Sequence, residues 1–262
     1  MRRTLSVLLT ILILGLVLPA VCEPATDNSE DLRSFLQQHY GIAILMGDEC
    51  REYPSENYQI VITPEGSTAF QQMVYGNRRF ADMLRLLDDV LSVYPPDFFS
   101  GFKWTNHYGG IIFLLVDDIL RDGMSYGGFQ YGADSDGKIL IWLSRTSAKE
   151  RAIHHEIGHA MDYRIRWKTP DAFDHWYELN PDDFLYTGDF SISGTGKGNE
   201  EPNDWFVREY SKIDEYEDRA TVFEALMMKD DDWWSTRPYL QRKAQYLLDK
   251  AEPVFGEIFP GE

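Results

Sequence analysis

The chain has 262 residues, of which 44% are hydrophobic, and its 43 acidic residues outnumber its 25 basic ones, so the formal net charge at pH 7 is −18. This charge argues against nucleic acid and against anionic membrane surfaces as partners, because both are themselves negatively charged. The length and the apolar content suffice for one sizeable domain, or for two lobes that share a cleft.

Residues 1–22 have the pattern of a secretory signal peptide. Two arginines follow the initial methionine, and a mostly apolar run over 5–18 precedes small residues that include Cys22. The run is short for a membrane-spanning helix, which needs roughly 20 residues. We predict cleavage after Cys22, which leaves residues 23–262 as a secreted chain without a membrane span. Two alternatives stay open: a lipid anchor at Cys22, as in a cell-surface lipoprotein, and a retained N-terminal anchor.

The next part of the chain alternates between strand-like and helix-like patterns. Two short apolar runs, within 34–49 and 57–63, are separated by a turn-like stretch, and we expect them to pair as strands. Hydrophobic residues at helical spacing predict a long helix over about 67–93, which Pro95 and Pro96 stop.

Two further strands are expected in the middle of the chain. The continuous apolar run within 109–120 follows a glycine pair and predicts a buried strand. A glycine-rich stretch over 125–137 leads into a second strand at 138–143. This glycine-rich stretch is either an edge strand that could hold an extended substrate by backbone pairing, or a plain connection.

The C-terminal part of the chain is expected to be helical. A polar, glycine-rich loop over 187–204 precedes helical patterns over 214–230 and 237–255. We therefore expect a single α+β domain over 23–262. Its N-terminal lobe (about 30–166) would hold a small mixed sheet, its C-terminal lobe (about 167–262) would be helical, and a cleft would lie between them.

The stretch RAIHHEIGHAMDYRI, residues 151–165, is expected to form a helix. Ser147 and Glu150 have the spacing of a capping box, which predicts Ser147 as the N-cap. A buried apolar stripe should follow at helical spacing, made of Ile153, Ile157 and Met161.

Three residues of this helix have the pattern of a catalytic zinc site. His155 and His159 are one turn apart on one face, so both imidazoles can reach a single ion. Glu156 lies beside them, where it can act as a general base without ligating the metal. His-Glu-x-x-His on a helix is the known pattern for this chemistry, although the five-residue pattern alone also occurs in unrelated chains.

The other histidines are expected to be structural or exposed. His154 lies on a different helix face, so we interpret it as a hydrogen-bonded histidine and not as a ligand. Asp162 is either a hydrogen-bond acceptor for a ligand imidazole or a solvated helix charge. The remaining histidines, His39, His107 and His175, have no partner at ligand spacing.

A catalytic zinc ion needs a third protein ligand. A metzincin would require Gly at 162 and His at 165, so Asp162 and Ile165 exclude that class. Glu178 imitates the thermolysin arrangement, but Pro181 disfavours the continuous helix that this arrangement needs. Glu217 is another candidate for the third ligand. Glu224, two helical turns further along the chain, could take its place.

The role of Glu217 has an alternative as well. Asp214 and Glu217 have the spacing of a capping box, so Glu217 could merely cap a helix.

The motif HEIGHAMD, followed far downstream by Tyr210, Glu217, Ala220 and Phe223, resembles the zinc peptidase domain of anthrax lethal factor and its relatives. Together with VYPPDFF at 93–99, it is also similar to secreted bacterial zinc-binding metallopeptidases, over roughly residues 60 to 230. The chain lacks the receptor-binding and substrate-docking domains of the toxin, so toxin function does not carry over.

The resemblance implies a zincin-like fold and one Zn²⁺ per chain, bound by His155, His159 and Glu217. It also implies that Glu156 and Tyr210 are catalytic, with Tyr210 stabilising the oxyanion. We therefore expect a secreted, gluzincin-type zinc metallopeptidase that hydrolyses peptide bonds in extracellular peptides or proteins. The alternative is a zincin-fold binding or cell-surface module without catalytic activity.

Overall fold

The computed structural model describes residues 29–53, 55–63, 79–95, 97–105, 107–192 and 203–258. The expected signal peptide and residues 193–202 of the expected loop lie outside these ranges. Within the described part of the chain, no helix combines the length and the apolar character needed to cross a membrane.

The main sheet has four strands in the order β1 (Ala43–Met46), β5 (Ile111–Val116), β9 (Ile139–Ser144) and β8 (Gly128–Ala133). The first three run parallel and β8 is antiparallel to β9, so the sheet is small and mixed, as predicted. Every residue of β5 and β9 is buried, because both faces of the sheet are covered. The glycine-rich stretch does form an edge strand, β8.

The two faces of the sheet pack into different cores. Ile111, Phe113 and Leu115 of β5 contact the larger core, which also contains residues of the helices. The alternate residues of β5 contact a smaller core that includes Trp142 and Cys50. This alternation follows from the opposite directions of successive strand side chains.

Two smaller sheets flank the main one. β2 (Gln59–Val61), β6 (Asp118–Arg121) and β7 (Met124–Ser125) form a three-stranded antiparallel sheet. β3 (Lys103–Thr105) and β4 (Tyr108–Gly109) form a two-stranded antiparallel one.

The expected pairing of the two N-terminal apolar runs is wrong. The first run begins inside helix α1 (Ser29–Tyr40), which buries Leu36 and Tyr40 at helical spacing. Only β1 remains of it as a strand, and β1 pairs with β5, whereas β2 pairs with β6. Pairing with the fully buried β5 lets β1 join the main core, which a local hairpin would not do.

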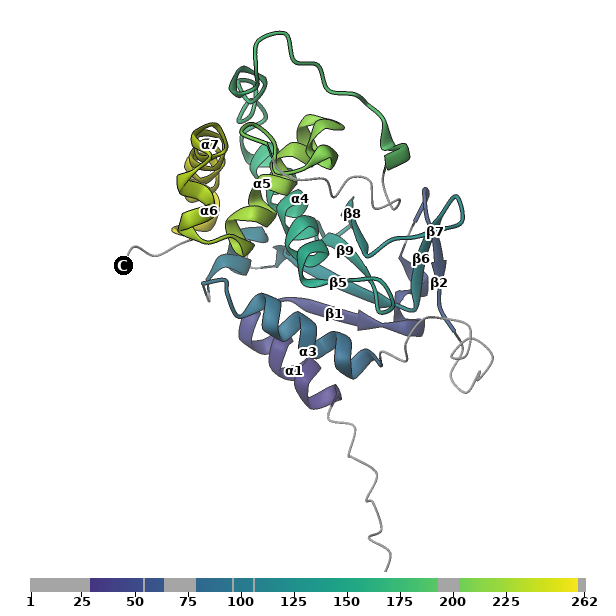
Figure 1. Cartoon of the computed structure of the whole chain (residues 1–262). Coiled ribbons are helices and arrows are strands. Elements are labelled where there is room, and N and C mark those ends of the chain that lie inside the picture. Colours follow the sequence, from purple (N-terminus) through teal and green to yellow (C-terminus); the bar gives the residue numbers. More distant parts are fainter. Residues whose placement is uncertain are drawn as a thin grey trace, which may run out of the picture.

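Helices α1, α3 (Phe80–Leu91) and α4 (Glu150–Lys168) contribute to the larger core beside the sheet (Figure 1). The end of α3 at Leu91 agrees with a stop before Pro95. Of the predicted helix over 67–93, residues 67–78 lie outside the described part of the chain.

The predicted N-cap of α4 is wrong, although its buried stripe of Ile153, Ile157 and Met161 is confirmed. The helix begins at Glu150 with Lys149 at the N-cap position. Ser147 instead takes part in a network of hydroxyl groups, in which its side chain bonds to that of Ser125. The serine side chain is therefore not available to cap the helix.

The C-terminal part contains the two predicted helices, α5 (Glu215–Met228) and α7 (Pro238–Phe255), joined by the short α6 (Asp231–Ser235). α5 lies along α4, and α7 packs against α5 (Figure 1). A Cβ atom at Gly158 would lie 3.2 Å from Cα of Ala220, so a glycine and an alanine permit this close approach of α4 and α5.

Short 3-10 helices lie between these elements: η1 (Gly47–Glu52), η2 (Phe98–Phe102), η3 (Tyr177–Leu179), η4 (Phe190–Ile192) and η6 (Glu209–Lys212).

Candidate metal centre

His155 and His159 of α4 meet Glu217, which lies in the first turn of α5. His155 Nε2 is 3.0 Å from Glu217 Oε2 and 3.1 Å from His159 Nε2. His159 Nε2 is 3.3 Å from the same carboxylate oxygen. Because α4 packs closely on α5, three atoms that carry lone pairs come together, and all three could bind the same ion.

These three residues fit a zinc ion. Ligand atoms about 2.0–2.1 Å from a tetrahedral zinc lie roughly 3.3 Å from one another, close to the separations found here. Two imidazoles and one carboxylate are a ligand set of catalytic zinc sites, which keep a fourth position for water or substrate. His155, His159 and Glu217 also form the group of potential ligands that the described residues bring together.

The charges of the three groups depend on one another. Burial alone would lower the pKa of His155, but hydrogen bonds to Glu217 and Glu224 raise it to about 9. Burial alone would raise the pKa of Glu217, but His159 and His155 hold it well below its usual range. Without a metal, the centre is thus held together by a buried ion pair.

Glu217 does not act as the helix cap through its side chain. Asp214 is the N-cap residue of α5, and its carboxylate accepts a hydrogen bond of 2.8 Å from the backbone N–H of Glu217. The Glu217 carboxylate is directed instead at the two histidines. The backbone N–H that Asp214 caps and the carboxylate that faces the histidines are therefore different parts of the same residue.

Glu156 lies beside the centre and is buried. Burial raises the pKa of its carboxyl group, which the charges of His155 and His159 oppose, and the backbone N–H of Gln130 in β8 donates a hydrogen bond to it. A carboxylate with a raised pKa binds a proton more readily, as a general base requires.

A cavity of about 210 Å³ opens onto these groups. Its other walls include Gly128, Phe129 and Gln130 of β8, together with Tyr58 and Tyr126. Phe129 stacks on Tyr58 with 4.2 Å between the ring centroids. The edge strand β8 therefore borders the same cavity as the candidate ligands.

Tyr210 reaches the centre from η6. Its hydroxyl donates a hydrogen bond of 3.2 Å to Glu217 Oε1, and its ring lies edge-on to the ring of His155 at 5.7 Å. The structure thus brings together all five residues that the sequence analysis assigned to the site.

Several alternatives from the sequence lie elsewhere. His154 is fully buried, and its Nδ1 forms a hydrogen bond of 2.7 Å with the hydroxyl of Tyr94, away from the centre. Glu178 is exposed and pairs with the side chain of His175 at 2.7 Å, so neither is near the centre.

Asp162 is neither a hydrogen-bond acceptor for an imidazole of the centre nor a solvated helix charge, the two roles expected from the sequence. It is buried and forms an ion pair of 3.1 Å with Arg219 of α5 and another of 3.3 Å with Arg166. It therefore joins α4 to α5 and does not contact a ligand imidazole.

The contact of Glu224 with His155 was not predicted from the sequence. Glu224 lies 3.3 Å from His155 Nδ1, the ring nitrogen that faces away from Glu217, and it pairs with Arg208. The spacing of seven residues from Glu217, which puts both glutamates on one face of α5, was the signal that could have indicated this position.

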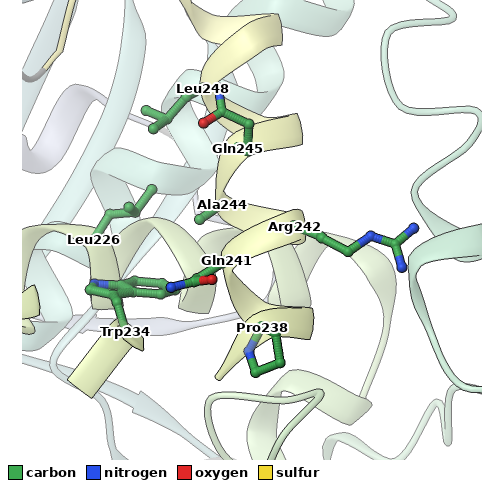
Figure 2. A pocket seen from close by; sticks show the side chains of 8 residues that line it. All are labelled: Leu226, Trp234, Pro238, Gln241, Arg242, Ala244, Gln245 and Leu248. Carbon is green, nitrogen blue, oxygen red and sulfur yellow. The ribbon is translucent and has the colours of Figure 1, made fainter. Parts of the chain in front are cut away.

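A second cavity, of about 480 Å³, lies by α6 and α7. Figure 2 shows the indole of Trp234 opposite Gln241 and Ala244 of α7. Its lining contains no histidine, cysteine or carboxylate, so it has no metal-binding chemistry.

No family model matches this chain, and no curated protein matches it. One solved structure, of a "putative zinc-binding metallo-peptidase" from Bacteroides caccae, is similar with a TM-score of 0.36 and 12% identity, over 90% of each chain.

Proposed function

We propose that this protein is a zinc-dependent peptidase of the gluzincin type with a zincin-like fold, and that it hydrolyses peptide bonds in extracellular peptides or proteins. The observation that carries the proposal is the convergence of His155 Nε2, His159 Nε2 and Glu217 Oε2 within 3.3 Å of one another. A buried glutamate and an edge strand beside the same cavity complete the arrangement.

The three converging residues would hold the ion. When bound, zinc would polarise the substrate carbonyl and make a water molecule more acidic. Glu156 would accept the proton from that water on its carboxylate and pass it to the leaving amine, which its raised pKa favours.

Tyr210 would donate its phenolic proton to the oxyanion that forms at the substrate carbonyl. The hydroxyl already lies at the centre, 3.2 Å from Glu217 Oε1.

The edge strand β8 would hold an extended substrate by backbone hydrogen bonds, which select for peptide character and not for one side chain. The extracellular setting of the substrate depends on the predicted signal peptide.

Purified protein should contain one zinc ion per chain and should cleave a denatured, fluorescently labelled protein. Glu156→Gln should retain the zinc and lose activity by roughly 10²–10⁴-fold, the usual contribution of a general base. If the wild type binds zinc but cleaves no peptide or protein, the chain would instead be a zincin-fold binding module.

A further inference from the structure

Among the described residues, Glu224 and His155 approach each other through two buried polar atoms that lack a hydrogen bond of good geometry. Glu224 Oε2 lies 3.3 Å from His155 Nδ1, and both atoms are buried. Within the described part of the chain, neither atom has a hydrogen-bond partner of good geometry, and the 3.3 Å between them is an ion-pair contact. Because buried polar atoms are rarely left unpaired, these two are best understood as a pair.

Glu224 is itself held in place by Arg208. The guanidinium group of Arg208 forms an ion pair with the other oxygen of Glu224, and Arg151 of α4 lies 3.9 Å from that same oxygen. The Glu224 side chain is only 4% exposed and that of Arg208 only 10%. A carboxylate at this depth needs such a partner, because burying an unpaired charge is very unfavourable.

Arg208 also contacts the other side of the centre. Its guanidinium carbon lies 5.3 Å from the centroid of the Tyr210 ring. The segment that carries both residues is attached to α5 by a hydrogen bond of 2.7 Å between the hydroxyls of Ser211 and Thr221. Arg208 thus contacts both Glu224, the carboxylate that faces His155, and the ring of Tyr210.

We propose that Glu224 and Arg208 are positioning residues of the metal centre. Glu224 accepts the N–H of His155 at Nδ1, which leaves the lone pair on Nε2, the nitrogen that faces His159 and Glu217. Arg208 holds the Glu224 carboxylate at the distance that this requires. This inference rests on the proposed function, since it concerns how the zinc ligands are oriented.

The test compares Glu224→Gln with Asp162→Asn, using zinc alone as the probe. Asp162 is a matched control, because it is also a buried carboxylate paired with an arginine between α4 and α5, but it does not contact a histidine. Circular dichroism first establishes that both variants are folded. Zinc affinity is then measured by competition with a chelator.

We expect Glu224→Gln to bind zinc about 10–100-fold more weakly than the wild type, as is typical of partners that orient a ligand, and Asp162→Asn to stay within about threefold. Nitrogen NMR of the zinc-loaded wild type should show a proton on His155 Nδ1 that exchanges slowly with water. In Glu224→Gln this proton should exchange faster.

Arg208 is tested by two variants. Arg208→Gln should weaken zinc binding to a similar degree as Glu224→Gln, and the double variant should be no weaker than the worse single one. Arg208→Lys, which keeps the charge, should recover at least part of the affinity. If Glu224→Gln does not fold, the Arg208 variants still test the proposed positioning role.

The outcomes separate this inference from the proposed function. If the wild type binds no zinc, the proposed function fails. If the wild type binds zinc, but Glu224→Gln and Arg208→Gln bind it as tightly as Asp162→Asn does, the positioning roles are wrong while the proposed function stands.

Discussion

Nε2 of His155 lies 3.0 Å from Oε2 of Glu217, although 62 residues separate them in the sequence. The contact forms because α4 and α5 pack closely where Gly158 meets Ala220. That packing does not use the carboxylate, so its removal should take away a candidate zinc ligand and leave α4 and α5 packed together.

Glu217→Ala should weaken zinc binding at least about 100-fold, more than the 10–100-fold typical of residues that only orient a ligand. Metal analysis and chelator competition measure this. Glu215→Ala is the matched control, since Glu215 lies in the same helical turn but is 41% exposed and pairs with Arg219 instead of the histidines. Equal zinc content in the wild type and Glu217→Ala would show that the third ligand is another residue.

Zinc binding should release protons. Hydrogen bonds to Glu217 and Glu224 overcome the effect of burial and raise the pKa of His155 to about 9, so this imidazole is protonated at pH 7 in the metal-free protein. It must lose a proton to become a ligand. We expect a release of about one proton at pH 7, and an apparent affinity that rises about tenfold per pH unit from pH 6 to 8. Calorimetry in buffers with different ionisation enthalpies measures the release, and a value of zero would contradict the expectation.

Tyr210→Phe should keep the zinc and lower kcat by roughly 10²-fold, because only the phenolic O–H that would stabilise the oxyanion is lost. The control is Tyr216→Phe, which removes a hydroxyl from a partly exposed side chain on α5. A Tyr210→Phe enzyme with the wild-type kcat would show that Tyr210 only supports the structure of the site.

Acid should destabilise the fold through His154. Burial lowers the pKa of this histidine from 6.5 to about 4. Below pH 6.5 the unfolded chain therefore binds a proton that the folded protein does not, and the free energy of unfolding decreases until about pH 4.

The size of this effect is on the order of 2–3 kcal/mol, since one pKa unit corresponds to about 1.4 kcal/mol. Urea unfolding of zinc-free protein at pH 4.5 and 7.5 measures it. His154→Gln should reduce the difference between the two pH values by that amount, because the other titrating groups are common to both proteins. An unchanged difference would mean that the folded protein protonates His154 easily.

A buried ion pair joins α5 to α7. Lys243 Nζ lies 2.7 Å from Asp218 Oδ2, and both side chains are fully buried. Lys243→Met should lower the free energy of unfolding by about 3–5 kcal/mol, because Asp218 would lose its cationic partner and keep only the hydrogen bonds from Trp176 and Tyr186.

Denaturant unfolding tests this, with Arg242→Met as the control on an exposed neighbouring position of α7, expected to change stability by less than about 0.5 kcal/mol. Adding Asp218→Asn to Lys243→Met should restore part of the loss. A Lys243→Met protein as stable as the control would mean that the pair does not contribute to stability.

Local patterns in the sequence were sufficient for much of the fold. Apolar runs predicted the buried strands β5 and β9, and helical periodicity predicted α4, α5 and α7. These features depend on neighbouring residues, which is why they can be inferred without a structure.

The sequence by itself determined that His155 and His159 share a helix face with Glu156 beside them, because a helix sets the direction of side chains one turn apart. Only the tertiary structure showed that Glu217, and not Glu178, faces Nε2 of both histidines, found the strand partners of β1 and β2, and placed Asp162 with an arginine. These contacts join residues far apart in the chain, and the packing of whole helices and strands sets their distances. No local pattern contains that information.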